Sequence, residues 1–173
     1  MFIHGVKKLI KMCKKVKRAL KVNANFIFAK RGISFFKDRP TINVRSKFNG
    51  NTYLGSNTHF NGITITGKGN VYIGDNFHCG LDCLIISDAH DYKNATKLPY
   101  DDKILTPDTI IEENVWLGSR VIILPGVKVG YGAIVQAGSV VVENVKPLAV
   151  VGGHPAKQFS ERCKTSYELL DKK

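Results

Sequence analysis

The chain has 173 residues, of which 43% are hydrophobic and 23% charged, a balance that is typical of one soluble globular domain and argues against disorder. No run of about 18 apolar residues occurs, so the sequence contains no segment that could cross a bilayer, and the N-terminus lacks the apolar centre of a secretory signal. We therefore expect a cytoplasmic protein whose four cysteines are thiols.

The net charge of +12 is concentrated near the N-terminus. Residues 1–47 hold 14 Lys and Arg against one acid, a balance of +13, whereas residues 48–173 hold 12 bases and 13 acids, a balance of −1. A nucleic-acid-binding domain spreads a basic face over its body and adds aromatic side chains for stacking. We therefore do not expect nucleic acid as a partner.

Residues 2–21 form the first predicted element, an amphipathic helix within a basic segment that spans residues 1–40. Apolar residues recur there at intervals of three and four, with eight Lys and Arg between them. Two roles remain open. In the first, which is favoured, the apolar stripe packs against the end of the following repeat domain and caps it. In the second, residues 1–22 attach to the anionic inner surface of a membrane. The two roles are compatible.

The dominant pattern is a repeat of six residues. From Ile111 the chain divides into the blocks IEENVW, LGSRVI, ILPGVK, VGYGAI, VQAGSV and VVENVK, each opened by an aliphatic residue and with a small or β-branched residue in the fifth place. A period of six indicates a coil of short strands separated by turns, with the opening residues pointing inward. The same phase runs upstream through Ile42, Phe48, Leu54, Phe60, Ile73, Cys79 and Ile85. We expect a fold dominated by β-structure, with the coil over residues 41–155.

Two segments depart from the repeat. Residues 87–109 are polar and rich in turn-forming residues, and a long irregular insertion in a compact repeat is usually functional or mobile, so we expect a projecting loop. After Pro155 the six-residue pattern ends, and Phe159, Cys163, Tyr167 and Leu170 follow at roughly helical spacing. This spacing predicts a C-terminal helix over residues 156–173.

The run NVWLGSRVIILPGVKVGYGAIVQAGSVV, followed by GGHPAK, resembles the hexapeptide-repeat acyltransferases. The most similar branch contains the maltose, galactoside and polysaccharide O-acetyltransferases and the xenobiotic acetyltransferases. The resemblance covers about residues 41–158. It implies a left-handed parallel β-helix, a homotrimer with sites between subunits, and acetyl-CoA as co-substrate.

The resemblance also implies that His90, in the loop sequence IISDAHDY, is the catalytic residue. Acyl transfer from a thioester to a hydroxyl requires a base that removes the hydroxyl proton and returns it to the departing thiolate. Imidazole, with an unperturbed pKa of about 6.5, suits both steps at neutral pH. Asp88, Asp91 or a backbone carbonyl would orient the ring, and the sequence leaves this choice open. A solvated loop histidine is the structural alternative.

Further positions are carried over from the resemblance. Gly118 and Ser119 match positions near the thioester, where a backbone N–H of a rigid coil could stabilise the oxyanion. Ala137, Gly138 and Lys157 match positions along coenzyme A. The chain departs from the family in two places, because Val142-Glu143 stands where Thr-Lys is frequent and His154 stands where Asn is common. These departures weaken the expected contacts to phosphate.

Asn61, Trp116 and Asp88 are the candidates for binding the acceptor. His59 is equally eligible with Asn61, since the alignment there is loose by a residue or two. Trp116 sits in the sixth place of its block and points away from the coil interior, so a role in packing between subunits competes with a role in the site. Asn57 and its neighbouring asparagines are also expected at corners of the coil.

The sequence thus favours an O-acetyltransferase that modifies a hydroxyl of a saccharide or polysaccharide precursor. A small xenobiotic acceptor stays open. The first alternative is N-acetylation of an amino sugar or other amine, whose enzymes usually add an N-terminal domain for which 40 residues leave no room. The second is a trimeric assembly module without activity. A zinc site of the γ-class carbonic anhydrase type needs a His-x4-His element, which is absent, and Cys79 should point into the core, so no metal is expected.

Overall fold

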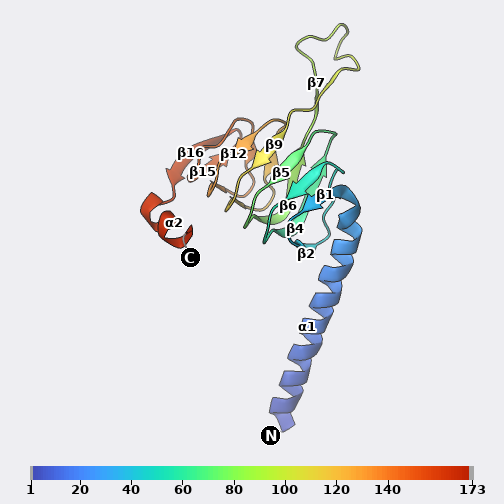
Figure 1. The fold of residues 1–173 in the computed structure, drawn as a ribbon, viewed down its shortest axis with the longest axis vertical. Helices are drawn as coiled ribbons and strands as arrows, with labels where there is room; N and C mark the ends of the chain where they lie inside the picture. Colours follow the sequence, from blue (N-terminus) through green and yellow to red (C-terminus); the bar gives the residue numbers. More distant parts are fainter. Residues whose placement is uncertain (1, 172–173) are drawn as a thin grey trace.

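The computed structural model describes residues 2–171, and within this range all side chains except those of residues 2–6, 8 and 9. Its body is a coil of short parallel strands, with one helix towards each end of the chain (Figure 1). The parallel β-helix with two helices that the sequence predicts is therefore confirmed. The left hand of the coil stays a prediction of the resemblance.

The coil has three faces, each built from stacked strands of successive turns. The first face contains β2 (Thr41–Val44), the first halves of β4 (His59–Thr66) and β6 (His78–Ile86), then β10 (Trp116–Leu117), β13 (Ile134–Val135) and β15 (Ala149–Gly153). The second contains the remaining halves of β4 and β6, then β11 (Ile122–Ile123) and β14 (Val140–Val141). The third contains β1 (Ile33–Phe36), β3 (Thr52–Leu54), β5 (Val71–Ile73), β9 (Thr109–Ile111) and β12 (Lys128–Val129).

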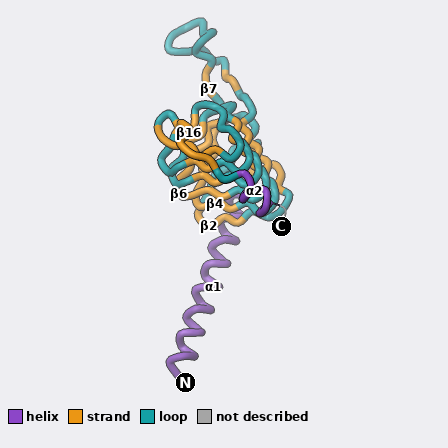
Figure 2. The backbone as a smooth tube through the Cα atoms, turned by 90° about the vertical axis from the view of Figure 1, so that its left-hand side faces the viewer, coloured by secondary structure: helices purple, strands orange, loops and turns teal. Residues whose placement is uncertain are grey.

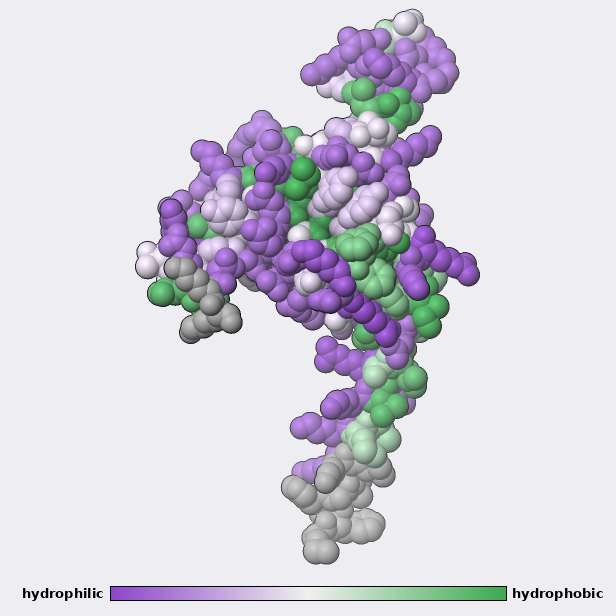
Figure 3. Space-filling model, in the orientation of Figure 1, coloured by the Kyte–Doolittle hydropathy of each residue, from purple (hydrophilic) through white to green (hydrophobic). Residues whose placement is uncertain are grey.

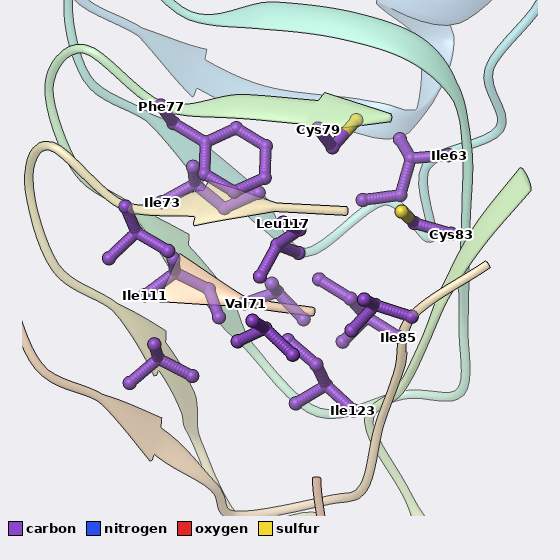
Figure 4. Packing of buried hydrophobic residues seen from close by; sticks show 14 of the residues in the cluster. Ile63, Val71, Ile73, Phe77, Cys79, Cys83, Ile85, Ile111, Leu117 and Ile123 are labelled. Atoms are coloured by element: carbon purple, nitrogen blue, oxygen red, sulfur yellow. The ribbon is translucent and has the colours of Figure 1, made fainter. Parts of the chain in front are cut away.

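The core consists of the side chains that the six-residue phase points inward. The opening residues identified from Ile42 to Val141 are all at most 5% exposed. Figure 4 shows Ile85, Leu117 and Ile123 converging on one interior from different strands. Cys79 is fully buried at an opening place, as expected, and the cysteines are free thiols. Burying each aliphatic side chain contributes about 1.5–3 kcal/mol, so the repeat itself supplies the stability of the coil.

One corner of the coil is held by a ladder of asparagines. Asn57, Asn76 and Asn114 adopt left-handed φ angles of 53°, 56° and 59°, a conformation that asparagine tolerates better than most residues. The amide of Asn57 donates to Asn76 at 2.9 Å, and the amide of Asn76 donates to Asn114 at 2.9 Å. Asn57 is therefore a corner residue, as expected.

Residues 87–108 leave the coil between β6 and β9 as a projecting loop. Its two short strands, β7 (Ala89–His90) and β8 (Ile104–Leu105), pair antiparallel at the neck of the loop. Figures 1 and 2 show from two directions that the loop extends well beyond the strands of the coil. The loop begins at the corner between the second and the third face, because β6 ends on the second face and β9 lies on the third.

The N-terminal region differs from expectation in three respects. The helix α1 (Phe2–Ala29) runs eight residues beyond residue 21 and is followed by the short 3-10 helix η1 (Lys30–Gly32). The coil begins earlier than residue 41, because β1 already pairs with β3. Capping by the apolar stripe is wrong for the described side chains, since Ile10, Val16 and Leu20 are at least half exposed. Neither helix within residues 2–171 combines the length and the apolar character needed to cross a membrane.

The C-terminal helix is shorter than predicted. Residues Ala156–Glu161 form a strand, β16, which pairs antiparallel with β15, and the helix α2 spans only Lys164–Asp171. The prediction of a helix over residues 156–163 is therefore wrong. The tight turn after Gly153 reverses the chain, and the free edge of β15 offers backbone partners that outweigh the helical spacing of a few apolar residues.

Candidate active site

His90 lies at the neck of the loop, at the end of β7. Its Nδ1 atom lies 3.2 Å from the carbonyl oxygen of Asp101, and a carbonyl only accepts hydrogen bonds. In a neutral imidazole this contact selects the tautomer with the proton on Nδ1, which leaves Nε2 with a free lone pair. Of the three orienting groups that the sequence left open for His90, the backbone carbonyl is the one that the structure provides.

An aromatic neighbour fixes the plane of the His90 ring. The ring of Tyr100 stacks on it with centroids 3.6 Å apart and an angle of 20° between the planes. His90 itself is only partly buried. The imidazole is therefore held by one ring contact and one hydrogen bond, and part of its surface is exposed.

Asp91 strengthens the neck of the loop, and the partners of its carboxylate are Lys103 and Asn94. Its carboxylate is buried, lies 2.6 Å from the ammonium of Lys103, and accepts hydrogen bonds from the side-chain amide of Asn94. Lys103 and, to a smaller extent, Asn94 lower the pKa of Asp91. The backbone N–H of Asp91 also donates to the Lys103 carbonyl at 3.0 Å. Asp91 thus acts as a structural anchor of the loop.

Asp88, a candidate for substrate binding, lies at the root of the loop. Its Oδ2 atom accepts a hydrogen bond from the backbone N–H of Lys68 at 3.0 Å. The other carboxylate oxygen lies against Gly67, where an added Cβ atom would come within 2.5 Å of it. Asp88 therefore holds the loop to the preceding turn of the coil, and this structural role explains its position.

Asn61 lies on the first face, in a row of polar side chains. Its amide donates to the carbonyl of Cys79 at 2.9 Å and lies 3.3 Å from Nε2 of His78. Its Oδ1 atom accepts a hydrogen bond from Asn43 at 3.0 Å. The His59 ring stacks on the His78 ring at 5.9 Å. Burial, and then the neighbouring imidazole of His78, lower the pKa of His59.

Trp116 extends this row by one turn of the coil. It is paired in register with His78, and half of its surface is exposed. Both side chains line a groove of about 610 Å³ between the first face and α2, to which Arg162 and Tyr167 also contribute. The structure thus brings together Asn61 and Trp116, two of the three acceptor candidates, through His78.

Gly118 and Ser119 lie at the corner after the first face, where successive turns approach closely. A Cβ atom on Gly118 would come within 2.4 Å of the backbone nitrogen of Ala137, and one on Gly80 would come within 2.5 Å of that of Ser119. The result is a smooth strip of small residues. The N–H of Gly118 donates to Val135 at 2.8 Å, so it is already engaged within the coil and is not a free oxyanion donor.

Gly138 and Lys157 extend the strip to the last turns. Gly138 has a φ of +74° and nothing within 4 Å of an added Cβ atom, so its surface is open. Lys157, in β16, is exposed and lies 3.3 Å from Glu143, the acid that departs from the family pattern. The hairpin is tied to this turn because the N–H of Gly153 donates to the Ser139 hydroxyl at 3.2 Å. The five cofactor candidates therefore follow one line along the coil.

One chain does not bring His90 to the row of Asn61, His78 and Trp116. The row lies on the first face, and the small-residue strip follows the corner between the first and the second face. The loop leaves from a different corner, between the second and the third face. Figure 1 shows β7 on a loop that extends away from β4 and β6.

Sequence reasoning named His59 but missed its partner His78. The two are 19 residues apart, which is one coil turn plus one inserted residue, and both occupy sixth places, so the repeat could have predicted that their rings stack. Tyr100 and Asp101 gave no signal, because a backbone carbonyl and a ring contact inside an irregular loop have no pattern. Among the described residues, no group of three or more His, Cys, Asp or Glu is arranged to hold a metal ion.

Comparisons with known proteins relate the repeat to transferases. Residues 108–143 match the family model described as bacterial transferase hexapeptide (six repeats), which confirms the resemblance. Chloramphenicol acetyltransferase of Klebsiella aerogenes is 44% identical over 55 residues, or 32% of this chain and 26% of that protein. The 2,3,4,5-tetrahydropyridine-2,6-dicarboxylate N-acetyltransferase of Clostridium perfringens (strain SM101 / Type A) is 49% identical over 65 residues, or 36% of this chain and 28% of that protein. The chain thus spans little more than a quarter of these relatives.

A solved structure extends the likeness over most of the coil. The structure of galactoside acetyltransferase in complex with coenzyme A covers 81% of this chain and 65% of that chain, with 25% identity and a TM-score of 0.63. The chain is therefore similar to hexapeptide-repeat acetyltransferases in both its repeat sequence and its fold.

Proposed function

We propose that this protein is an acetyl-CoA-dependent O-acetyltransferase that acts on a hydroxyl of a saccharide or polysaccharide precursor, with His90 as the general base. The observation that carries the proposal is the Nδ1 contact to the Asp101 carbonyl, since it presents Nε2 as a proton acceptor on an exposed loop. The repeat match and the acetyltransferase relatives supply the reaction class.

In this mechanism Nε2 of His90 removes the proton of the acceptor hydroxyl as its oxygen attacks the thioester carbonyl. A carbon–oxygen bond forms, and the tetrahedral intermediate then breaks its carbon–sulfur bond. The imidazolium returns the proton to the thiolate, so the products are an acetyl ester and free coenzyme A. The Asp101 carbonyl stabilises the imidazolium because it accepts a hydrogen bond from Nδ1–H throughout.

The strip of small residues fits the extended arm of acetyl-CoA. Gly118 allows its turn to approach the backbone of Ala137 closely, since a Cβ atom there would strike that backbone, and two such small residues offer a thin chain little obstruction. Lys157 lies at the far end of the strip and would attract the phosphates, although Glu143 at 3.3 Å offsets part of its charge. We expect Gly118, Ser119, Ala137, Gly138 and Lys157 to contact the co-substrate.

The row on the first face suits a sugar acceptor. Sugars bind through hydrogen bonds to amides and imidazoles and through contact of their apolar faces with aromatic rings. Asn61 and His78 supply the polar groups, and Trp116 supplies a half-exposed ring. The galactoside acetyltransferase among the similar structures supports a saccharide acceptor.

We further propose that the active site forms between two subunits of a homotrimer. The loop with His90 and the row with Asn61 lie at different corners of one coil. A neighbouring copy in a closed ring can place its loop beside the row, which joins the base and the acceptor site. The exposed thiols of Cys13 and Cys163 support a location in the reducing cytoplasm.

Acetylation of an amine is the second candidate. The Clostridium perfringens relative with 49% identity over 65 residues is an N-acetyltransferase. The two candidates differ in their product, because an acetyl ester is cleaved by mild hydroxylamine, whereas an amide is not.

The test is release of free thiol from acetyl-CoA with a panel of sugars, nucleotide sugars and amines. We expect turnover with a hydroxyl acceptor that falls by about 10²-fold or more in His90→Ala. Lys93→Ala, an exposed change on the same loop, is the matched control and should retain activity. Equal turnover of His90→Ala and the parent protein would contradict the proposal. Absence of coenzyme A binding in a calorimetric titration would instead favour an assembly module.

A further inference from the structure

The helix α1 contacts the coil at its C-terminal end. The amide of Asn25 donates to the carbonyls of Ile42 and Asn43, each at 3.1 Å. Ala29 is 2% exposed, and the ring of Phe26 packs against that of Phe36 with centroids 5.8 Å apart. Figures 1 and 2 show the remainder of the helix extending away from the coil.

The apolar stripe lies on the opposite face of α1. Leu20 precedes Ala29 by nine positions, and Val16 precedes Asn25 by nine. Nine positions are two and a half turns at about 3.6 residues per turn, so the members of each pair lie on opposite faces. Val16, Leu20 and Ile27 are 53%, 63% and 70% exposed. Figure 3 shows apolar side chains along the exposed helix. Val16 and Leu20 therefore lie clear of the coil, and Ile27 stays largely exposed.

The charge of this helix has a single sign. Residues 1–29 contain eight Lys and Arg and no Asp or Glu. Lys11 precedes Ala29 by 18 residues, which is five turns, so it lies on the face opposite the stripe. Lys17 and Lys21 flank the stripe, because they are one residue from Val16 and Leu20. Their long side chains can extend beside an apolar surface and place their charges at its border.

The stripe continues into an apolar groove at the base of the helix. The groove has a volume of about 660 Å³ and lies between α1 and the first turn of the coil. Ala24, Ile27 and Phe48 form its apolar lining, and Arg31 and Lys47 also line it. The guanidinium of Arg45 lies 3.8 Å from the centroid of the Phe28 ring next to them. An apolar groove with several cations around it fits one kind of ligand, an acyl chain attached to an anionic headgroup.

We propose that α1 and the groove at its base bind the surface of an anionic phospholipid bilayer. The stripe enters the boundary between headgroups and acyl chains, an acyl chain lies in the groove, and Arg31 and Lys47 contact phosphate. This inference is independent of the acetyltransferase proposal. It places the coil on the aqueous side of the membrane, because the coil and the stripe lie on opposite faces of α1.

The charge of α1 favours a bilayer over a second copy of α1 as the partner of the apolar stripe. Helices that associate through an apolar seam usually pair acids with bases along its flanks. Here each copy would bring eight cations and no acid, so parallel helices would repel one another without compensation. An anionic surface gains from every cation near it, by about 1 kcal/mol each.

The experiment is flotation of the full chain with vesicles of phosphatidylcholine alone and of phosphatidylcholine mixed with phosphatidylglycerol. We expect binding to the mixed vesicles only, and weaker binding at high salt. Val16→Gln with Leu20→Gln should abolish flotation. Lys17→Gln with Lys21→Gln should weaken it on the order of tenfold or more.

The matched control is Lys93→Gln with Lys97→Gln, which removes the same charge from the projecting loop and should bind as the parent protein does. Circular dichroism and sedimentation of each variant show whether α1 and the assembly are retained. Equal flotation with both kinds of vesicle, flotation with neither, or equal loss in the loop control would overturn the proposal. If the parent protein does not float and the variant with Val16→Gln and Leu20→Gln no longer self-associates, the stripe is an interface with a second copy of the chain.

Discussion

The coil and the projecting loop are built by different means. In the coil, backbone hydrogen bonds between turns and a continuous apolar core repeat the same contacts many times. In the loop, the neck is held by the ion pair of Asp91 with Lys103 and by the stack of His90 on Tyr100. The repeated contacts give stability that no single polar group controls. The loop instead depends on a few individual side chains, and the candidate base is one of them.

The largest expected effect separates chemistry from stability. His90→Ala should lower kcat by about 10²–10⁴-fold, because it removes the base, and should hardly change the unfolding temperature. Thiol release and thermal unfolding measured on the same sample check both parts. Matching losses of activity and stability would show that His90 is a structural residue.

A substitution in the core should lower stability and leave the activity of the folded protein unchanged. Ile123→Ala removes a fully buried side chain and leaves a cavity between coil turns, which should lower the free energy of unfolding by about 2–5 kcal/mol. The folded fraction should retain acetyl transfer, since Ile123 points inward. Urea unfolding gives the loss of stability, and turnover well below the midpoint gives the activity. An inactive but stable variant would contradict the division between the two regions.

The asparagine ladder tests a polar contact within the coil. Asn76→Ala loses its hydrogen bonds to Asn57 and Asn114 and places alanine at a φ of 56°, so it should destabilise the fold by about 1–2 kcal/mol. Asn76→Gly loses the same bonds without the backbone strain and should cost less. Comparing the two unfolding free energies isolates the strain. A larger loss for glycine would refute this interpretation.

The smallest effect is a pH dependence confined to the loop. Lys103 and Asn94 lower the pKa of Asp91, so the ionised carboxylate stabilises the folded neck. This contribution is present above the ordinary pKa of about 4 and is lost as pH falls through the lower folded value. We expect hydrogen-exchange protection at the Asp91 amide to fall at acidic pH, after correction for intrinsic exchange. In Asp91→Asn it should be weak at every pH, and protection in the coil should change in neither protein.

The repeat could be read from the sequence because it is a local periodic pattern. The six-residue phase identified the inward residues from Ile42 to Val141, all of which are buried. It also placed Trp116 on the outside, where half of its surface is exposed. Each of these positions depends on contacts that recur in every turn, so the phase is sufficient to predict them.

The non-repeating parts were less predictable, for physical reasons. Phe159 and Tyr167 have helical spacing, but the strand edge of β15 recruits residues 156–161 into a hairpin, and only the rest forms a helix. The carbonyl of Asp101 that contacts His90 belongs to the backbone and has no signature in the side chains. The direction of the stripe on α1 depends on which face docks to the coil, which spacing alone does not reveal.

The most direct measurement of the central claim is complementation between two inactive chains. His90→Ala lacks the base, Asn61→Ala lacks the acceptor amide, and each should be nearly inactive alone. If each site takes its loop from one subunit and its row from the next, random mixing in a cyclic trimer should restore about one quarter of the parent activity. Mixing folded variants without subunit exchange is the control. Absence of recovery after verified subunit exchange would contradict an active site formed between subunits.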